Sequence, residues 1–160
     1  MKRVKPDQFH FKKFSVTHKR SSMKVGTDGV LLGAWADVKH AHSILDIGTG
    51  TGLIALMLAQ RTPNTVYIDA VELNPEACQD ARENFSKSPW EYRIHLYEQP
   101  IQVLTLQKKY DLIVTNPPYF TNSFKPSYSG RTLARHTDSL SHEDIIAFAT
   151  AHLREAGVLS

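Results

Sequence analysis

Four consecutive residues, Asn116, Pro117, Pro118 and Tyr119, combine types that suit one kind of chemistry. They follow the apolar run Tyr110–Thr115, whose β-branched residues predict a buried strand. The two prolines remove two backbone donors and fix φ, so the loop is stiff and its carbonyls face outward. An Asn amide, a proline carbonyl and an aromatic ring can together hold a planar group that carries an –NH₂. We therefore expect a methyl-acceptor site here, provided that a methyl donor binds next to it.

A glycine-rich turn is the candidate donor site. Ser43–Asp46 predicts a strand, and the apolar run Leu53–Ala59 predicts a buried helix. The turn between them has the form D-x-G-x-G-x-G, and its alternate glycines permit a tight turn and close approach of a ligand to the backbone. A dinucleotide fingerprint would place its third glycine one residue later. The expected cofactor contacts in this turn are Asp46, Gly48, Thr49, Gly50 and Gly52.

A carboxylate follows the next predicted strand, Val66–Val71. Glu72 stands about 20 residues beyond the glycine turn, a spacing that places a carboxylate near ribose hydroxyls. A glycine turn alone is weak evidence, and Asn-Pro-Pro can also be a plain turn with Tyr119 as a core aromatic. The three features together favour a methyltransferase site over an ordinary α/β turn.

Composition is that of one globular domain, with 160 residues, 41% of them hydrophobic and 22% charged. The apolar runs are too short to span a membrane, and no signal-peptide pattern opens the chain. The single cysteine, Cys78, follows a helix-starting Asn74-Pro75 pair and is expected to be a core residue. Because it cannot form an internal disulfide, we expect a cytoplasmic protein. The short apolar runs predict no membrane partner. The histidines lack metal-ligand spacing, so no metal site is expected.

Strands and helices alternate along the chain. After a short helix at Asp28–Trp35, the expected elements are strand Ser43–Asp46, helix Leu53–Ala59, strand Val66–Val71, a helix from Pro75, strands Arg93–Tyr97 and Tyr110–Thr115, helix His142–Arg154, and a last strand that starts at Gly157. This order predicts an α/β fold with a doubly wound, mostly parallel sheet and a ligand at the carboxyl ends of its strands. Gly48, Glu72 and Asn116 all fall at such ends, which favours one shared site.

Positive charge gathers in the first 24 residues, which hold 8 of the 19 Lys and Arg. They are Lys2, Arg3, Lys5, Lys12, Lys13, Lys19, Arg20 and Lys24, interleaved with Phe9, Phe11 and Phe14. Basic residues with aromatics suit contact with RNA, although a solvated flap whose phenylalanines pack on the core explains them equally well. The long basic loop Phe120–Ser139 is a second candidate contact, with plain disorder as its alternative.

Four blocks together resemble the bacterial tRNA (adenine-N6) methyltransferase family, which modifies the adenine beside the anticodon of a valine tRNA. They are Met23–Trp35, Leu45–Arg61, Val71–Ala77 and Asn116–Tyr119. The match runs in order from about Phe9 to Ser160, and Lys24–Gly29 separates it from glutamine and guanine-N2 methyltransferases that share Asn-Pro-Pro-Tyr. The resemblance implies a Rossmann-like class I fold, S-adenosylmethionine as methyl donor and tRNA as partner. It also implies further cofactor contacts at Thr27, Asp28, Leu73 and Gln99.

The chain departs from this family at two places. Members usually carry an acid after the third strand that meets the cofactor's adenine, and the aligned position here is Pro100, so Gln99 or a neighbouring backbone group is expected to replace it. The family fold also continues past a fifth strand into a helix and a hairpin. We therefore expect a C-terminally truncated form, with a basic arm over residues 1–27 and an incomplete methyltransferase domain over residues 28–160.

The expected reaction transfers a methyl group from S-adenosylmethionine to the exocyclic N6 of a tRNA adenine. In this hypothesis the Asn116 side-chain oxygen and the Pro117 carbonyl accept hydrogen bonds from the two N–H groups of that nitrogen, and Tyr119 stacks on the base. A protein glutamine or an rRNA guanine carries a similar planar –NH₂ and is an alternative acceptor. An inactive RNA-binding relative is the alternative from another class.

Overall fold

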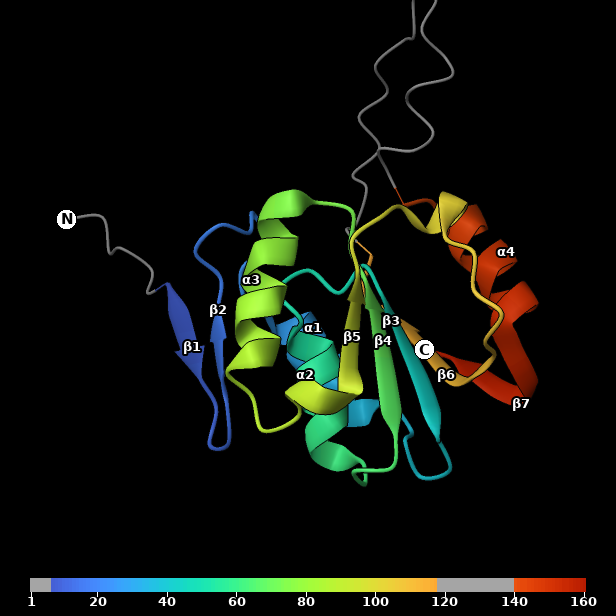
Figure 1. The fold of residues 1–160 in the computed structure, drawn as a ribbon, viewed down its shortest axis with the longest axis horizontal. Helices are drawn as coiled ribbons and strands as arrows, with labels where there is room; N and C mark the ends of the chain where they lie inside the picture. The colour runs from blue at the N-terminus through green and yellow to red at the C-terminus, as the bar shows by residue number, and fades with distance from the viewer. Residues whose placement is uncertain (1–6, 118–139) are drawn as a thin grey trace, which may run out of the picture.

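A five-stranded parallel sheet organises the part of the chain that the computed structural model describes, residues 7–117 and 140–160. The strand order is β5-β4-β3-β6-β7, so the sheet winds outward in both directions from β3 and the predicted doubly wound α/β fold is confirmed (Figure 1). The strands are β3 (Ser43–Ile47), β4 (Tyr67–Val71), β5 (Ile94–Tyr97), β6 (Tyr110–Thr115) and β7 (Leu153–Leu159). The carboxyl ends of β3, β4 and β6 meet where the order reverses, which is where such sheets bind ligands.

Both faces of the sheet are buried, which explains why its strands read as continuous apolar runs. Ile44 pairs with Ile68 and with Leu112, and these side chains belong to the hydrophobic core cluster on one face. The next residues along the strands, Leu45 and Ile113, belong to the cluster on the other face. Alternate side chains of each strand therefore enter opposite layers of the core.

In the described part of the chain, four α-helices cover the sheet: α1 (Thr27–Trp35), α2 (Leu53–Arg61), α3 (Pro75–Ser86) and α4 (His142–His152). The first three lie on one side of the sheet and α4 lies on the other (Figure 1). Helix α3 begins as predicted, because Asn74 Oδ1 accepts from the backbone N–H of Glu76 at 2.9 Å and of Ala77 at 3.0 Å. Cys78 is buried on this helix, and burial raises the pKa of its thiol to about 12, so it is a core residue as expected.

An antiparallel hairpin that the sequence interpretation missed lies beside α3 (Figure 1). Its strands are β1 (Gln8–His10) and β2 (Ser15–Thr17). Between them, the rings of Phe11 and Phe14 stack with centroids 4.6 Å apart, and Phe14 is buried against the core. These two phenylalanines therefore pack as the flap alternative describes, whereas Phe9 is exposed.

The end of the chain differs from the predicted boundaries. Helix α4 was expected to reach Arg154, but it ends at His152 because Leu153 already has an extended conformation with ψ 143. The last strand therefore starts at Leu153 rather than at Gly157, and it pairs parallel to β6. Two short 3-10 turns, η1 (Glu91–Arg93) and η2 (Ile101–Val103), flank β5. Within residues 7–117 and 140–160, no helix is both long and apolar enough to cross a membrane.

Candidate active site

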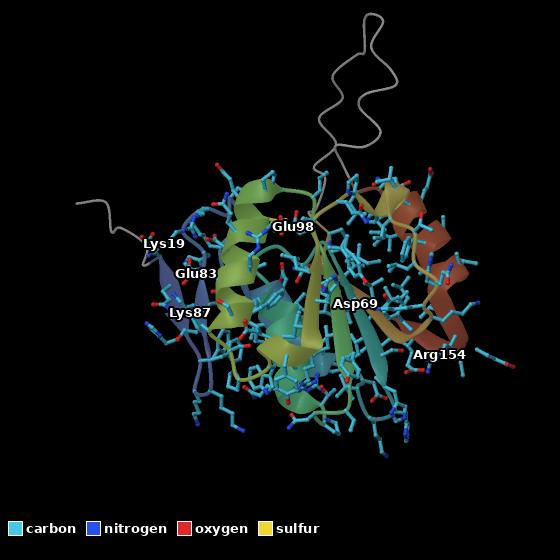
Figure 2. All side chains as sticks on the ribbon, in the orientation of Figure 1. Lys19, Asp69, Glu83, Lys87, Glu98 and Arg154 are labelled. Carbon is cyan, nitrogen blue, oxygen red and sulfur yellow. The ribbon has the colours of Figure 1, made fainter. Side chains whose placement is uncertain are left out.

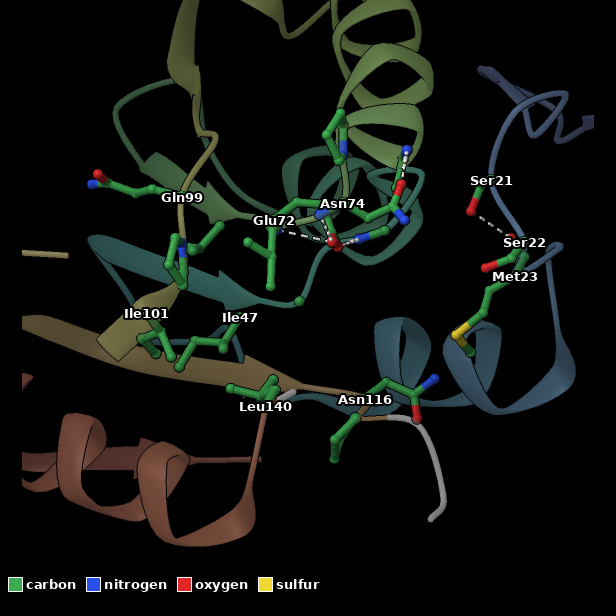
Figure 3. Close-up of a pocket in the computed structure, with 18 of the residues that line it drawn as sticks. Ser21, Ser22, Met23, Ile47, Glu72, Asn74, Gln99, Ile101, Asn116 and Leu140 are labelled. Carbon is green, nitrogen blue, oxygen red and sulfur yellow. Dashed lines mark hydrogen bonds between the residues drawn. The ribbon is translucent and has the colours of Figure 1, made fainter. Parts of the chain in front are cut away.

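A cavity of about 620 Å³ opens at the carboxyl ends of β3, β4 and β6 (Figure 3). Its volume lies in the range of small-molecule sites. Seven of the residues proposed from sequence line it: Gly48, Gly50, Glu72, Leu73, Gln99, Asn116 and Pro117. The structure thus brings the candidate donor site and the candidate acceptor site into one space, as the shared-site prediction required.

The glycine turn forms the floor of this cavity, and its backbone conformation needs glycine. Gly48, Gly50 and Gly52 have φ of 69, 58 and 82, values that side chains rarely adopt. A Cβ on Gly50 would meet nothing within 4 Å, so this part of the backbone stays open to a ligand. A Cβ on Gly52 would lie 2.4 Å from the Phe85 ring of α3, which packs beneath the turn. Glycine at position 50 therefore leaves the backbone open to a ligand, whereas glycine at position 52 leaves room for the Phe85 ring.

Asp46 organises the turn from inside the protein. It is fully buried, and its Oδ2 accepts from Thr49 Oγ1 at 2.7 Å and from the Ala55 N–H at 3.1 Å. Oδ1 has no partner among the described residues. Burial raises the pKa of Asp46 to about 7, against the opposing effect of these two hydrogen bonds. Asp46 and Thr49 therefore tie the end of β3 to the start of α2.

Glu72 stands at the end of β4 and joins the two sides of the turn. Its Oε2 accepts from the Gly50 N–H at 2.8 Å, and its Oε1 accepts from Leu73 N at 2.9 Å and from Asn74 N at 2.8 Å. The carboxylate is half-buried at the edge of the cavity, as the labelled side chain in Figure 3 shows. It can therefore accept from ligand hydroxyl groups while the backbone N–H groups hold it in place.

Gln99 and Pro100 line the cavity together after β5. The acid just before them, Glu98, is exposed and forms an ion pair with Arg82 of α3. Figure 2 shows Glu98 at the same end of the molecule as the cavity. Because Glu98 is paired with Arg82, Gln99 stays the predicted replacement for the acid that family members usually carry after the third strand.

Asn116 and Pro117 follow β6 and line the acceptor side of the cavity. Figure 3 shows the Asn116 side chain pointing into the same part of the cavity as Met23. A Cβ on the buried Gly29 of α1 would lie 3.8 Å from Asn116 Nδ2, so α1 supports this side chain closely. Pro118 and Tyr119 lie outside the described residues, as does the basic loop Phe120–Ser139.

Five of the predicted cofactor contacts do not line the cavity: Thr27, Asp28, Asp46, Thr49 and Gly52. The last three are buried within and beneath the turn and support its shape. Thr27 and Asp28 are exposed in the first turn of α1. Their contact with a cofactor, which the family resemblance implies, stays a prediction.

The sequence interpretation missed one wall of the cavity, which comes from Ser21, Ser22 and Met23. Figure 3 shows this segment across the cavity from Gln99. The only signal in the sequence was that Met23 opens the block Met23–Trp35, on which the family resemblance partly rests. Within residues 7–117 and 140–160, no three His, Cys, Asp or Glu side chains gather in a way that could hold a metal ion.

Comparison with known proteins gives a consistent result. The family model of the methyltransferase small domain matches residues 20–160. A protein of Trichodesmium erythraeum named tRNA1(Val) (adenine(37)-N6)-methyltransferase is 52% identical over 157 residues, which cover 96% of this chain and 66% of the relative. A protein of the same name from Parabacteroides distasonis is 54% identical over 140 residues, which cover 86% of this chain and 58% of the relative. The chain thus spans less than two thirds of the length of these curated relatives.

Solved structures share the fold at low identity. An O-methyltransferase from Bacillus cereus in complex with SAH superposes with a TM-score of 0.63 at 17% identity, over 88% of this chain and 58% of that one. A glycopeptide N-methyltransferase complexed with (S)-adenosyl-L-methionine gives a TM-score of 0.58 at 13% identity, over 83% of this chain and 51% of that one. These likenesses show a Rossmann-like class I fold.

Proposed function

The chain belongs to the methyltransferase small domain family, and from this premise we propose that it transfers a methyl group from S-adenosylmethionine to the exocyclic N6 of an adenine in tRNA. One observation carries the proposal: a single cavity joins the glycine turn and Glu72 to Asn116 and Pro117. The names of the relatives at 52% and 54% identity support an adenine beside the anticodon of a valine tRNA as the acceptor.

The residues of the donor side fit S-adenosylmethionine. Gly48 and Gly50 line the cavity with backbone at positive φ, which suits the methionine portion of the cofactor. Glu72 offers carboxylate oxygens to the ribose hydroxyls, and Gln99 offers an amide to the adenine end. When bound, the cofactor supplies an electrophilic methyl group on a positively charged sulfur. Thr27, Asp28 and Leu73 complete the proposed set of contacts.

The acceptor side addresses a specific chemical difficulty. The exocyclic nitrogen of adenine is a poor nucleophile because its lone pair is delocalised into the ring. In our proposal, Asn116 Oδ1 and the Pro117 carbonyl oxygen each accept a hydrogen bond from one N–H of this nitrogen. These two bonds favour a tetrahedral geometry at the nitrogen. The lone pair would then attack the methyl carbon, the sulfur–methyl bond would break to leave a neutral thioether, and the methylated nitrogen would release one proton to solvent. Asn116 and Pro117 thus act by positioning and electrostatics. Pro118 stiffens the loop, and Tyr119 stacks on a base that has left the RNA stack.

Two basic segments are proposed as tRNA contacts. The arm Lys2–Lys24 combines cations with aromatic side chains, and the loop Phe120–Ser139 follows the acceptor residues directly. Within the described part of the arm, Arg20 is engaged in ion pairs with Asp80 and Glu83, and Lys24 Nζ donates to the His18 carbonyl. The other exposed cations of this part are Lys12, Lys13 and Lys19, which we propose for contact with RNA. The division into an arm over residues 1–27 and a methyltransferase domain over residues 28–160 is part of the proposal. A cytoplasmic location, where tRNA is modified, is the matching expectation.

Substitution of Asn116 tests the proposed function. In Asn116→Ala, loss of a hydrogen bond that strengthens in the transition state should lower the rate of tRNA methylation by about 10- to 100-fold. Asn116→Asp is the matched control, because it keeps an oxygen that can accept from the –NH₂ group and should retain more activity than the alanine variant. The assay counts methyl groups transferred to tRNA from labelled S-adenosylmethionine. Near-normal methylation by Asn116→Ala would contradict the assignment.

A further inference from the structure

The cavity wall formed by Ser21, Ser22 and Met23 lies outside the five-stranded sheet. It belongs to the segment that connects β2 to α1, and Ser22 and Met23 are exposed. Inside this segment, Ser21 Oγ donates to the Met23 carbonyl at 3.0 Å, and Lys24 Nζ donates to the His18 carbonyl. Such short-range bonds shape the segment, but they do not fix it relative to the rest of the cavity. Its position must come from contacts with another element.

Asp80 of α3 provides the first of these contacts. Its side chain is fully buried, and its Oδ2 accepts from two consecutive backbone N–H groups, Arg20 N at 2.9 Å and Ser21 N at 2.8 Å. Oδ1 accepts from Arg20 Nη1 at 2.9 Å, and the same Nη1 also donates to Glu83 at 3.0 Å. Hydrogen bonds to a buried carboxylate are stronger than neutral ones. Asp80 therefore fixes the backbone at the residue where the cavity wall begins.

Asn84, one helical turn further along α3, provides the second contact. Its Oδ1 accepts from Thr17 N at 2.7 Å, and its Nδ2 donates to the Thr17 carbonyl at 2.8 Å. Nδ2 also donates to the carbonyl of Thr51 in the glycine turn at 2.8 Å. The side chain is 2% exposed, so none of these bonds competes strongly with water. Asn84 therefore joins the N-terminal segment and the glycine turn through a single amide.

The spacing of Asp80 and Asn84 explains how one helix supports both the Ser21–Met23 wall and the glycine turn. Positions i and i+4 lie on the same face of a helix, so Asp80 and Asn84 project together toward the N-terminal segment. Ala77, one turn before Asp80, lines the cavity itself, and Phe85 packs beneath Gly52. Glu83 of α3 forms an ion pair with Arg20 of the same segment. Helix α3 is thus the common support of the donor floor and the missed wall.

We infer that Asp80 and Asn84 are positioning residues for methyl transfer. They hold Ser21–Met23 at a fixed position relative to the glycine turn, so that the acceptor base is enclosed between Met23 and Asn116. The inference rests on the proposed function. Asp80 acts only on the wall segment, whereas Asn84 acts on both the wall segment and the turn. The two residues should therefore differ in what their loss does to cofactor binding.

Kinetics of two variants test this difference. In Asp80→Ala, the value of kcat/KM for tRNA at saturating S-adenosylmethionine should fall about tenfold or more, while the Kd of the cofactor, measured by calorimetry, should change less than about threefold. In Asn84→Ala, both quantities should worsen. Asp80→Asn keeps an oxygen that can accept both backbone N–H groups and should recover most of the lost activity. Glu83→Gln alters the half-buried carboxylate that pairs with Arg20 and Lys87 and leaves the Asp80 bonds to the backbone intact, so it is the matched control and should behave as the unaltered chain does.

Three outcomes would overturn the inference. They are unchanged kcat/KM in Asp80→Ala, loss of cofactor binding in parallel with activity in that variant, and an Asp80→Asn variant as impaired as Asp80→Ala. Met23→Ala covers the case in which Asp80→Ala does not fold, because Met23 is 54% exposed and its truncation removes little packing. This variant should also lower kcat/KM for tRNA without changing the Kd of the cofactor, and normal kcat/KM would count against the inference.

Backbone hydrogen exchange separates failure of this inference from failure of the proposed function, because it requires no methyl transfer. The N–H groups of Arg20 and Ser21 should exchange slowly in the unaltered chain, since each donates to the buried Asp80 carboxylate. In Asp80→Asn they should stay protected, and in Asp80→Ala they should exchange as fast as an exposed loop while α2 keeps its protection. Equal protection in all three proteins would overturn the inference even if tRNA is methylated.

Discussion

The glycine turn and the Ser21–Met23 segment lie on the same cavity, yet the chain holds them in different ways. The turn is shaped by Asp46, whose bonds reach Thr49 and Ala55, three and nine residues away. The segment is shaped by Asp80, whose bonds span 59 and 60 residues. A local motif therefore sets the shape of the donor floor, which Phe85 and Asn84 of α3 then support, whereas the opposite wall takes its shape from α3 directly. The difference teaches that one site can combine a part that a local motif specifies with a part that only long-range contacts specify.

The largest predicted effect concerns the glycine turn and the ring of α3 beneath it. In Gly52→Ala, a Cβ would lie 2.4 Å from the Phe85 ring on a backbone of φ 82. We expect left-handed strain and overpacking to lower the free energy of unfolding by about 2–5 kcal/mol in total. Cofactor binding should be lost as well, because the turn must shift. Urea unfolding and calorimetric titration of S-adenosylmethionine measure the two effects.

Gly50→Ala is the matched control for that substitution. Its φ of 58 carries similar backbone strain, but a Cβ there would meet nothing within 4 Å. The loss in unfolding free energy should be only about 1–2 kcal/mol, while cofactor affinity should still fall because the new methyl group stands in the cavity. Equal destabilisation by the two substitutions would show that Phe85 does not support the turn as the structure indicates.

A smaller predicted effect is the pH dependence of stability that arises from Asp46. Burial raises its pKa to about 7 in the folded protein, against an ordinary value of 3.8. Between these values the folded chain binds more protons than the unfolded chain, so this contribution to stability is complete below about pH 4 and is lost as the pH rises through about 7. One such group gives a slope of at most about 1.4 kcal/mol per pH unit. Asp46→Asn should remove that slope from the free energy of unfolding, and an unchanged slope would point to another group.

The smallest predicted effect extends the comparison from the cavity wall to the basic arm. Lys19 lies beside α3, close to the segment that Asp80 holds (Figure 2), whereas Lys12 lies in the turn of the β1–β2 hairpin. Lys19→Gln should reduce the slope of log affinity for tRNA against log salt by about 0.7–0.9, the value for one lost phosphate contact. Lys12→Gln is the matched comparison: Lys12 lies at the other end of β2 from Lys19, away from the segment that borders the cavity, so it should reduce the slope less. If neither variant changes the slope, the arm is a solvated flap.

The sequence was sufficient for the features that depend on neighbouring residues. The glycine turn, the N-cap at Asn74 and the strand before Asn116 each follow from local pattern, and the alternation of strands and helices predicts a parallel, doubly wound sheet. The β1–β2 hairpin was missed because its strands are three residues long and its stability comes from packing on α3. The end of α4 was misplaced because Leu153 and Arg154 read equally well as helix.

The sequence did not predict the Ser21–Met23 wall of the cavity for a related reason. Asp80 and Asn84 look like ordinary polar residues of an amphipathic helix, and nothing near them in the sequence indicates that both are buried. Their partners lie 59 to 67 residues earlier in the chain, except for Thr51. Only the fold brings Thr17, Ser21 and Thr51 to one face of α3.

The most direct test of the central claim is mass-spectrometric mapping of methylated nucleosides in tRNA after incubation with the chain and S-adenosylmethionine. A site that joins the glycine turn to Asn116 and Pro117 predicts N6-methyladenine at one position, beside the anticodon of a valine tRNA. Transfer of the methyl group to guanine N2 or to a protein glutamine would contradict the assignment of the acceptor. Absence of any transfer to tRNA by the chain would contradict the account as a whole.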